Sequence, residues 1–195
     1  MSSPGSSFFV LLSLVLWFIL YSYFGLVNSP RNTVVWYAQD NRARVLAMIV
    51  LIGSFGLLYL PFLSVGFLGR TVIRVSLMTS LSGMVICVAG LALAVWARLV
   101  MGAHWSGAVV LKEKHELIQD GPYSFMRHPV YAGVILALVG SAIIVGELRG
   151  FLAPVICFWG LWRRIQEEEA FLSRHFPQEY EDYRRRVKAL IPYIF

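Results

Sequence analysis

The chain has 195 residues, of which 58% are hydrophobic and 14% are charged, and its formal net charge is +6. Its mean hydropathy of +0.67 excludes an ordinary soluble domain, in which about a quarter of the residues are charged. We therefore expect an integral membrane protein of one domain's length. Its positive residues are scattered in loops and a tail, which argues against a nucleic-acid-binding face.

Three apolar segments in the first half of the chain predict membrane-spanning helices. No Lys or Arg precedes the first segment, so we expect a retained helix rather than a cleaved signal peptide. A polar loop follows it. Pro61 predicts a kink or an early end in the second segment. Gly90 and Ala94 in the third segment favour close helix packing in lipid. The predicted spans cover about residues 8–27, 45–68 and 75–96.

The second half of the chain begins with its longest polar interval, residues 98–127. Two shorter apolar runs follow, residues 130–145 and 151–162, and they predict a tilted helical hairpin. The second hairpin helix is expected to continue beyond the bilayer into charged sequence. The fold class predicted is therefore an all-α integral membrane protein with about five transmembrane helices. Four spans with a re-entrant pair remain an alternative.

Loop charges predict the orientation of these helices. With five alternating spans and a cytoplasmic C-terminus, fourteen of the seventeen Lys and Arg residues fall on the cytoplasmic side. Arg70, Arg74 and Arg149 fall outside, as does the N-terminus. We expect the inner membrane if the protein is bacterial and the endoplasmic reticulum if it is eukaryotic. The two cysteines, Cys87 and Cys157, lie in apolar runs and predict small buried side chains.

The tail after residue 162 predicts two helices separated by Pro177. The second is amphipathic, with Tyr180, Tyr183 and Val187 on one face. Its basic cluster, residues 184–186, favours contact with anionic headgroups of the membrane lipid. We expect this tail to belong to a cytoplasmic, helical cofactor-binding region. The chain accordingly divides into a three-helix membrane region, residues 1–97, and a catalytic region, residues 98–195.

Polar residues cluster at the start of the fourth predicted helix. His128 stands between Arg127 and Pro129, and Pro129 suits the first position of a helix because its missing N–H is not needed there. The first helical turn offers free amides and a positive dipole end beside a cation and an imidazole. This combination favours a carboxylate or phosphate ligand.

Three adjacent acids, Glu167 to Glu169, follow Arg164 in the tail. They cannot all face one way, because each helical residue turns about 100°. Glu168 lies four residues after Arg164, so the two share a helix face. They form either a plain intrahelical ion pair or a site for two ligands of opposite charge. Motifs for phosphate loops, Rossmann nucleotide sites and metal sites do not occur in the sequence.

The residues from His115 to Pro192 resemble the isoprenylcysteine carboxyl methyltransferase family, integral membrane enzymes that use S-adenosyl-L-methionine. The matching pieces keep their order and spacing: HELI at 115–118, GPY at 121–123, RHPVY at 127–131, Arg164 with the acids 167–169, and the ending FPQEYEDYRRRV.

The resemblance implies a carboxyl O-methyltransferase that acts on a lipophilic, isoprenylcysteine-like acceptor entering from the bilayer. It implies that Arg164 is the catalytic residue that engages the acceptor carboxylate, and it implies no metal. The cofactor-binding residues that it implies are His115, Glu116, Leu117, Ile118, Tyr123, His128, Pro129, Val130, Tyr131 and Glu168.

Other functions remain open. Phospholipid N-methyltransferases are distantly similar, but an amine acceptor must lose a proton and so requires a base. An S-methyltransferase of a small thiol is a further alternative. A sterol-type reductase using NADPH needs extra cations for the 2′-phosphate, and the acid run 167–169 argues against it. A non-enzymatic membrane scaffold has no use for the polar cluster at residues 115–131.

Overall fold

The computed structural model describes residues 4–26, 34–37, 41–102, 110–112 and 117–192. Most of these residues are helical, as predicted. In chain order the elements are α1 (Pro4–Leu26), β1 (Val34–Tyr37), α2 (Asn41–Tyr59), η1 (Pro61–Leu63), α3 (Leu77–Met101), β2 (Val110–Lys112), η3 (Gly121–Ser124), α4 (Pro129–Val145), α5 (Leu148–His175) and α6 (Pro177–Arg186).

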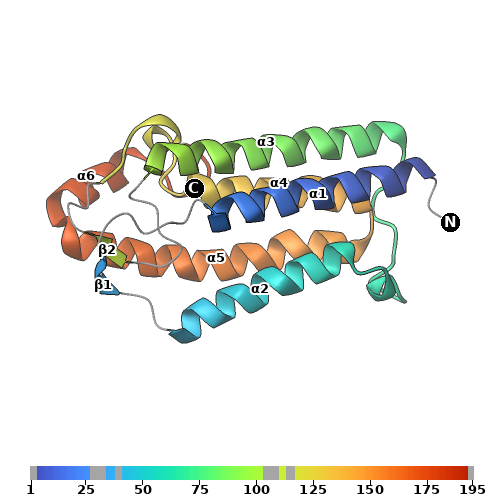
Figure 1. Cartoon of the computed structure of the whole chain (residues 1–195), viewed down its shortest axis with the longest axis horizontal. Helices are drawn as coiled ribbons and strands as arrows, with labels where there is room; N and C mark the ends of the chain where they lie inside the picture. The colour runs from blue at the N-terminus through green and yellow to red at the C-terminus, as the bar shows by residue number, and fades with distance from the viewer. Residues whose placement is uncertain (1–3, 27–33, 38–40, 103–109, 113–116, 193–195) are drawn as a thin grey trace.

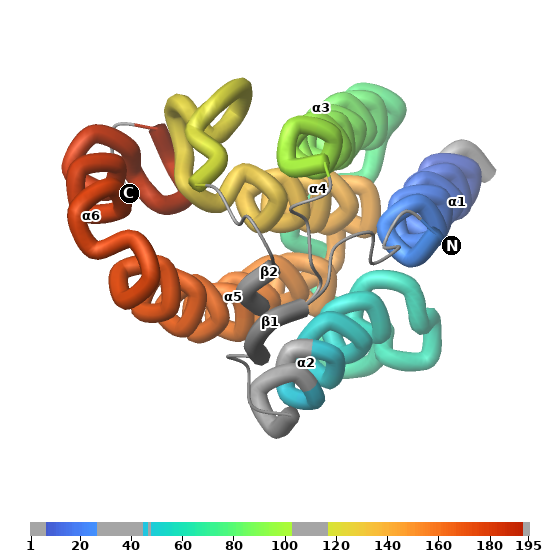
Figure 2. Tube along the Cα trace, turned by 60° about the vertical axis from the view of Figure 1, so that its left-hand side comes forward, coloured from blue at the N-terminus to red at the C-terminus, as the bar shows by residue number. Residues whose placement is uncertain are grey.

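The five long helices run along the long axis of an elongated bundle (Figure 1). Helix α3 packs on α4, α4 packs on α5, α2 packs on α5, and α1 contacts α3 and α4. Helix α6 and the C-terminal end of α5 lie together at one end of the bundle (Figure 2). The predicted hairpin is thus formed by α4 and α5, and α5 continues through the charged sequence as expected.

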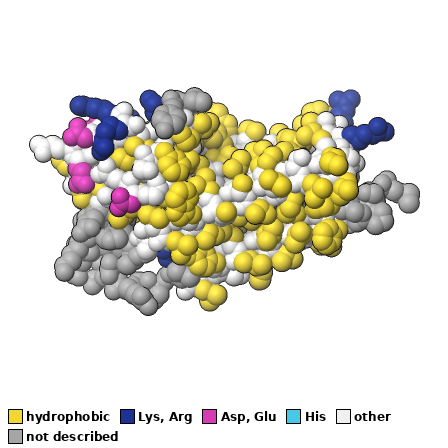
Figure 3. Space-filling model, turned by 90° about the horizontal axis from the view of Figure 1, so that it is seen from above, with side chains coloured by type: hydrophobic (Ala, Val, Ile, Leu, Met, Phe, Trp, Pro, Cys, Tyr) yellow, Lys and Arg dark blue, Asp and Glu magenta, His cyan; other side chains and the backbone are white. Residues whose placement is uncertain are grey.

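The surface of the bundle is largely apolar between its two ends. Exposed hydrophobic side chains include Phe18 on α1, Ile52 on α2 and Val85 on α3. Figure 3 shows hydrophobic side chains covering the middle of one face, with Lys and Arg side chains near both ends and Asp and Glu side chains near one end. A contiguous apolar surface of this kind is what a helix bundle in lipid presents.

Among the described residues, two helices are long and apolar enough to cross a membrane, Ser7–Leu26 and Leu77–Met101. The apolar stretches Met48–Tyr59 and Pro129–Val145 are shorter. The predicted count of five spans is therefore not confirmed. The third predicted span extends further than expected, because α3 continues to Met101.

The second predicted segment, residues 45–68, is not one helix to its end: α2 ends at Tyr59, which confirms the early end predicted at Pro61. Proline lacks the N–H that would continue the helix, so Pro61 begins a short 3-10 turn instead. The buried Arg149 then donates from Nη1 to the carbonyl oxygens of Leu57 and Leu60, at 2.7 and 3.1 Å. This contact replaces helix partners that the terminal carbonyls have lost.

The loop predicted after the first span contains a strand that the sequence did not indicate. Residues Val34–Tyr37 form β1, which pairs antiparallel with β2, Val110–Lys112. Short strands of this kind depend on a partner far along the chain, and local sequence does not identify that partner.

Small residues bring α3 and α4 into close contact. A Cβ atom added at Gly133 on α4 would lie 2.5 Å from the carbonyl oxygen of Gly90 and 2.8 Å from the amide nitrogen of Ala94. Gly83 and Gly140 form a second close approach of the same two helices. The spacing of Gly90 and Ala94 therefore predicted a real helix interface, in which glycine lets the two backbones meet.

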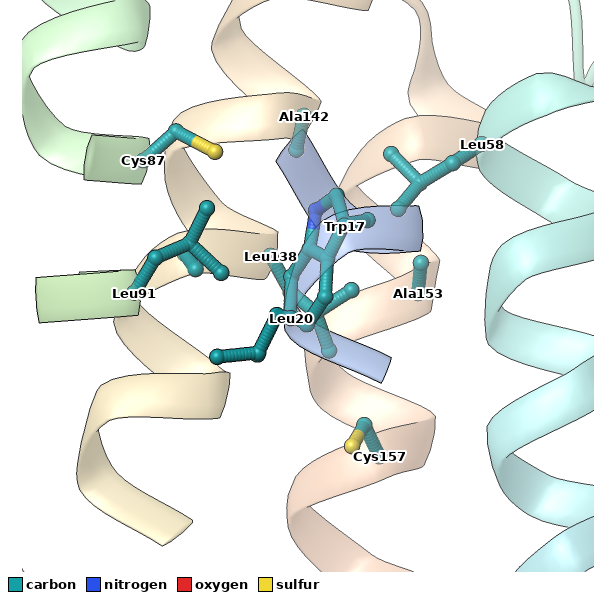
Figure 4. Packing of buried hydrophobic residues seen from close by; sticks show 10 residues of the cluster. Trp17, Leu20, Leu58, Cys87, Leu91, Leu138, Ala142, Ala153 and Cys157 are labelled. Atoms are coloured by element: carbon teal, nitrogen blue, oxygen red, sulfur yellow. The ribbon is translucent and has the colours of Figure 1, made fainter. Parts of the chain in front are cut away.

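The core below this interface contains a polar centre, Ser141. Its hydroxyl accepts a hydrogen bond from the indole of Trp17 at 3.0 Å and from the hydroxyl of Tyr59 at 3.3 Å. These contacts attach α1 and α2 to α4. Figure 4 shows Trp17 among the buried side chains, with Cys87 and Cys157 nearby in the same cluster. Both cysteines are free and buried, as predicted.

Candidate cofactor and acceptor site

The loop before α4 is held by the C-terminal segment of the chain. Pro129 is the first residue of α4, as predicted, and His128 precedes it as the N-cap residue. The backbone amide of Arg127 donates to the carbonyl of Lys188 at 2.8 Å, and that of His128 donates to Ala189 at 2.9 Å. The tail therefore fixes the backbone on which His128 stands.

The imidazole of His128 lies between two carboxylates of α5. Its Nδ1 is 3.5 Å from an oxygen of Glu168, and its Nε2 is 3.3 Å from an oxygen of Glu169. The ring also stacks on Tyr131, with centroids 5.7 Å apart. Burial lowers the pKa of His128, but its hydrogen bonds to Glu168 and Glu169 outweigh burial, so the pKa is raised.

Glu168 also binds the side chains of Tyr131 and Arg164. The hydroxyl of Tyr131 donates to Glu168, while Nε of Arg164 donates to that hydroxyl at 2.7 Å and to Glu168 at 3.1 Å. Arg164 and Glu168 share a helix face and form an ion pair, which was one of the two alternatives that their spacing left open. Burial alone would raise the pKa of Glu168. The hydrogen bond to His128 and the charge of Arg164 lower that pKa by more than burial raises it, so the carboxyl is held ionised.

Glu169 is a functional candidate that the sequence did not single out. Arg127 donates to its carboxylate from Nε at 2.9 Å, and Arg127 also donates to the backbone carbonyl of Val187. Burial raises the pKa of Glu169, but His128 and Arg127 lower it to about 2. The only available sequence signal was its adjacency to Glu168, which does not specify a partner 42 residues away.

Apolar contacts continue the site toward α3 and the tail. Ile118, Tyr123 and Val130 pack in one cluster with Ala97. Leu117 packs in another cluster, whose buried residues are Tyr180, Tyr183 and Val187. The predicted apolar face of the second tail helix is thus confirmed.

Tyr183 connects the tail helix to the loop, because its hydroxyl donates to the backbone carbonyl of Tyr123 at 2.6 Å. Through this contact and the backbone bonds at Arg127 and His128, the tail covers the loop from two points.

The structure thus gathers most of the predicted site residues at one end of the bundle. His128, Tyr131 and Arg164 all contact Glu168. Two others, His115 and Glu116, lie outside the described residues. Among the residues that are described, no group of three His, Cys, Asp or Glu side chains is placed to hold a metal ion.

The donor set fits a ligand that carries both signs of charge. Glu168 is a partly buried anion suited to an ammonium or to ribose hydroxyls, and the face of Tyr131 suits apolar atoms. Arg164 offers a planar guanidinium beside them, and such a group binds carboxylates through paired hydrogen bonds. These residues fit S-adenosyl-L-methionine beside a carboxylate acceptor.

Comparison with known proteins confirms the resemblance stated from the motifs. A model of the isoprenylcysteine carboxyl methyltransferase (ICMT) family matches residues 83–174. This range includes α4, the site residues on α5 and the loop residues Arg127 and His128, but not α6.

Curated relatives match about half of the chain. A probable protein-S-isoprenylcysteine O-methyltransferase of Oryza sativa subsp. indica is 34% identical over 84 residues, which are 43% of this chain and 44% of the relative. The protein-S-isoprenylcysteine O-methyltransferase of Schizosaccharomyces pombe is 34% identical over 50% of this chain and 43% of its own length. The human enzyme is 30% identical over 59% of this chain and 42% of its own length. The matched region thus spans less than half of each relative.

A solved structure shares the fold. The eukaryotic intramembrane Ras methyltransferase ICMT superposes with a TM-score of 0.65 at 22% sequence identity, covering 100% of this chain and 70% of that one.

Proposed function

We propose, on the premise that residues 83–174 belong to the isoprenylcysteine carboxyl methyltransferase family, that this protein is a membrane-embedded carboxyl O-methyltransferase. The observation that carries the proposal is the partly buried contact of Arg164 with Glu168 and Tyr131. It supports a site in which an arginine for the acceptor carboxylate lies next to an anion for the cofactor. The acceptor class that we propose is a lipophilic, isoprenylcysteine-like carboxylate.

The cofactor that we propose is S-adenosyl-L-methionine, which supplies an electrophilic methyl group when bound. Glu168 accepts hydrogen bonds from its ammonium or ribose. Tyr131 packs against its apolar atoms. The other residues of the proposed pocket are His115, Glu116, Leu117, Ile118, Tyr123, His128, Pro129 and Val130.

The chain's task in the reaction is alignment and exclusion of water. A carboxylate is already ionised at neutral pH, so the acceptor needs no general base. Arg164 holds one carboxylate through its guanidinium and points the attacking oxygen toward the methyl group. The bound cofactor would supply the methyl group to this oxygen, and the electron pair of the broken carbon–sulfur bond would stay on its sulfur. The burial of His128 and the partial burial of Glu168 limit the access of water to this alignment.

We further propose five spans, an outside N-terminus and a cytoplasmic site, with the acceptor entering from the bilayer. The apolar flank of the bundle and the charge distribution in the loops support this placement. The division into a membrane region, residues 1–97, and a catalytic region, residues 98–195, belongs to the same proposal.

Cofactor binding is tested with S-adenosylhomocysteine and detergent-purified protein by titration calorimetry. We expect binding by the unmodified chain, and a dissociation constant raised about tenfold or more in Glu168→Ala, because a hydrogen bond to a charged group is lost. His128→Ala is also expected to bind more weakly. Glu167→Ala is the matched control, because Glu167 is exposed on the same helix. Absence of binding by the unmodified chain at saturating ligand contradicts the proposal.

Methyl transfer is tested with radiolabelled cofactor against lipid thioether carboxylates, aminophospholipids and small thiols. We expect transfer to the carboxylates alone. Arg164→Ala is expected to lower that rate by about 10- to 100-fold, the loss of a charged hydrogen-bonded contact, while S-adenosylhomocysteine still binds. The exposed neighbour Arg163→Ala is the control. Full activity of Arg164→Ala would exclude the proposed contact of Arg164 with the acceptor carboxylate. Methyl transfer to amines or thiols would contradict the proposed carboxylate acceptor.

A further inference from the structure

Glu169 joins three segments of the chain at one buried carboxylate. One of its oxygens accepts from Arg127 at 2.9 Å and lies 3.3 Å from Nε2 of His128. The other oxygen lies 3.7 Å from Nε of Arg184 on α6. Glu169 is 6% exposed, and its partners Arg127 and His128 are also buried, whereas the side chain of Arg184 is half exposed. Glu169 is therefore the meeting point of α5, the loop before α4 and the tail.

His128 transmits the position of Glu169 to Glu168. Its two ring nitrogens face the two glutamates from opposite sides of the ring, at 3.3 and 3.5 Å. A neutral imidazole carries one N–H, so donation to both carboxylates at once requires the imidazolium form. Stacking on Tyr131 prevents the ring from turning away. In this state neither ring nitrogen is left to bind a cofactor directly.

We propose that Glu169 is a positioning residue: it holds His128 as a cation, and His128 then fixes the carboxylate of Glu168 toward the cofactor. The proposal rests on the cofactor role proposed above for Glu168. It assigns to Glu169 a role distinct from that of a tail anchor, since a tail anchor contributes stability without affecting the protonation of His128.

The charged groups around His128 support this assignment. The groups that face it are Glu168 and Glu169 from α5 and the ring of Tyr131 from α4. Behind the glutamates stand three cations, Arg127 and Arg184 beside Glu169, and Arg164 beside Glu168. These cations keep both carboxylates ionised, and the carboxylates in turn keep the buried imidazole charged.

Removing one of the two carboxylates changes the pKa of His128. In Glu169→Gln the ring keeps Glu168 and loses its second anion, while its burial still disfavours the charged form. The pKa of His128 is therefore expected to fall by at least about one unit. Above the new pKa the ring is neutral and keeps one N–H, so its bond to Glu168 loses its charge assistance and is weakened.

The test is a pH titration of the full-length, detergent-purified protein labelled with ¹³C,¹⁵N-histidine. The chain has four histidines, and the His128 signals are assigned by their loss in His128→Gln. We expect the unmodified protein to show both ring nitrogens protonated at pH 7. In Glu169→Gln the His128 midpoint falls, and the dissociation constant for S-adenosylhomocysteine rises about tenfold between pH 6 and 8. In the unmodified chain the dissociation constant for S-adenosylhomocysteine is expected to stay unchanged between pH 6 and 8.

Two controls separate positioning from stability. Glu167→Gln removes an exposed acid from the same helix and leaves both readouts unchanged. Glu169→Asp keeps the charge and is expected to keep His128 protonated at pH 7. A neutral His128 in the unmodified protein overturns the proposal, with no variant needed. It is equally overturned if Glu169→Gln leaves the midpoint unchanged. If the unmodified chain does not bind the ligand, the cofactor role proposed for Glu168 is refuted. The titration of His128 still tests whether Glu169 holds it protonated.

Discussion

Neighbouring acids on α5 have different partners because of the helical turn. Glu168 faces Arg164 and Tyr131, whereas Glu169 faces Arg127 and the tail. Glu167 is exposed. Each residue is rotated by about 100° from the one before it, so at most two adjacent side chains enter one buried cluster. The sequence predicted this limit correctly.

Acid should weaken the fold through Glu169. Its pKa is lowered from 4.5 to about 2, so its ionised form stabilises the folded state above pH 4.5, by about 3 kcal/mol. That stabilisation is lost as the pH falls through 4.5 to about 2. The melting temperature of Glu169→Gln in detergent should therefore lie furthest below that of the unmodified chain near neutral pH. A gap that stays constant from pH 7 to pH 3 contradicts this account.

At the residue scale, the sequence predicted contacts within one helix and missed those between helices. The pair Arg164–Glu168 follows from four-residue spacing. The contacts of Glu169 with Arg127 and His128 join positions 42 and 41 residues apart. They depend on how α4 packs on α5, which residue spacing does not specify.

Helix boundaries in this chain follow from its prolines. Pro61 ends α2 early, Pro129 begins α4, and Pro177 separates α5 from α6. A proline lacks its N–H and fixes its own backbone angle, so these boundaries were predictable from local sequence. The short pair β1–β2 was not, since neither strand is defined without the other.

The interface of α3 and α4 should not tolerate a side chain at Gly133. An added Cβ would lie 2.5 Å from a backbone oxygen of α3, and backbone cannot move aside as a side chain can. We expect Gly133→Val to lose about 1–3 kcal/mol of stability by overpacking. Binding of S-adenosylhomocysteine should weaken too, because α4 carries Tyr131. Thermal melting and calorimetry measure both effects.

Gly53→Ala supplies the matched control for this interface. Gly53 lies within a helix, α2, and an added Cβ there meets nothing within 4 Å. Its melting temperature should equal or exceed that of the unmodified chain, since alanine favours helix more than glycine does. If Gly133→Val and Gly53→Ala lowered stability equally, the loss in Gly133→Val would not be due to overpacking between α3 and α4.

For the whole molecule, the bundle has two unlike ends. One end holds the site, α6 and the C-terminal half of α5 (Figure 1). The other end holds the turn after α2 and the contacts of Arg149 with its carbonyls. The apolar flank between them was predictable from composition alone. The number of spans was not, because α4 is short and α5 changes from apolar to charged within one helix.

Cysteine labelling tests the proposed orientation. Cys87 and Cys157 are buried, so they should not react with a membrane-impermeant maleimide in the folded protein. We expect Ser64→Cys, in the exposed turn after α2, to be labelled from outside intact cells. Gln178→Cys, exposed on α6, should be labelled only after the membrane is opened. The reverse pattern would invert the topology.

The depth of the reaction centre follows from the continuity of α5. Fifteen residues separate Arg149 from Arg164 in one unbroken helix, a rise of about 22 Å. The hydrocarbon layer of a bilayer is about 30 Å thick. In the proposed orientation, Arg164 therefore lies beneath the headgroups unless the lipid thins around the bundle. In both cases the proposed acceptor would present its carboxylate to Arg164 while its lipid chain remained in the bilayer.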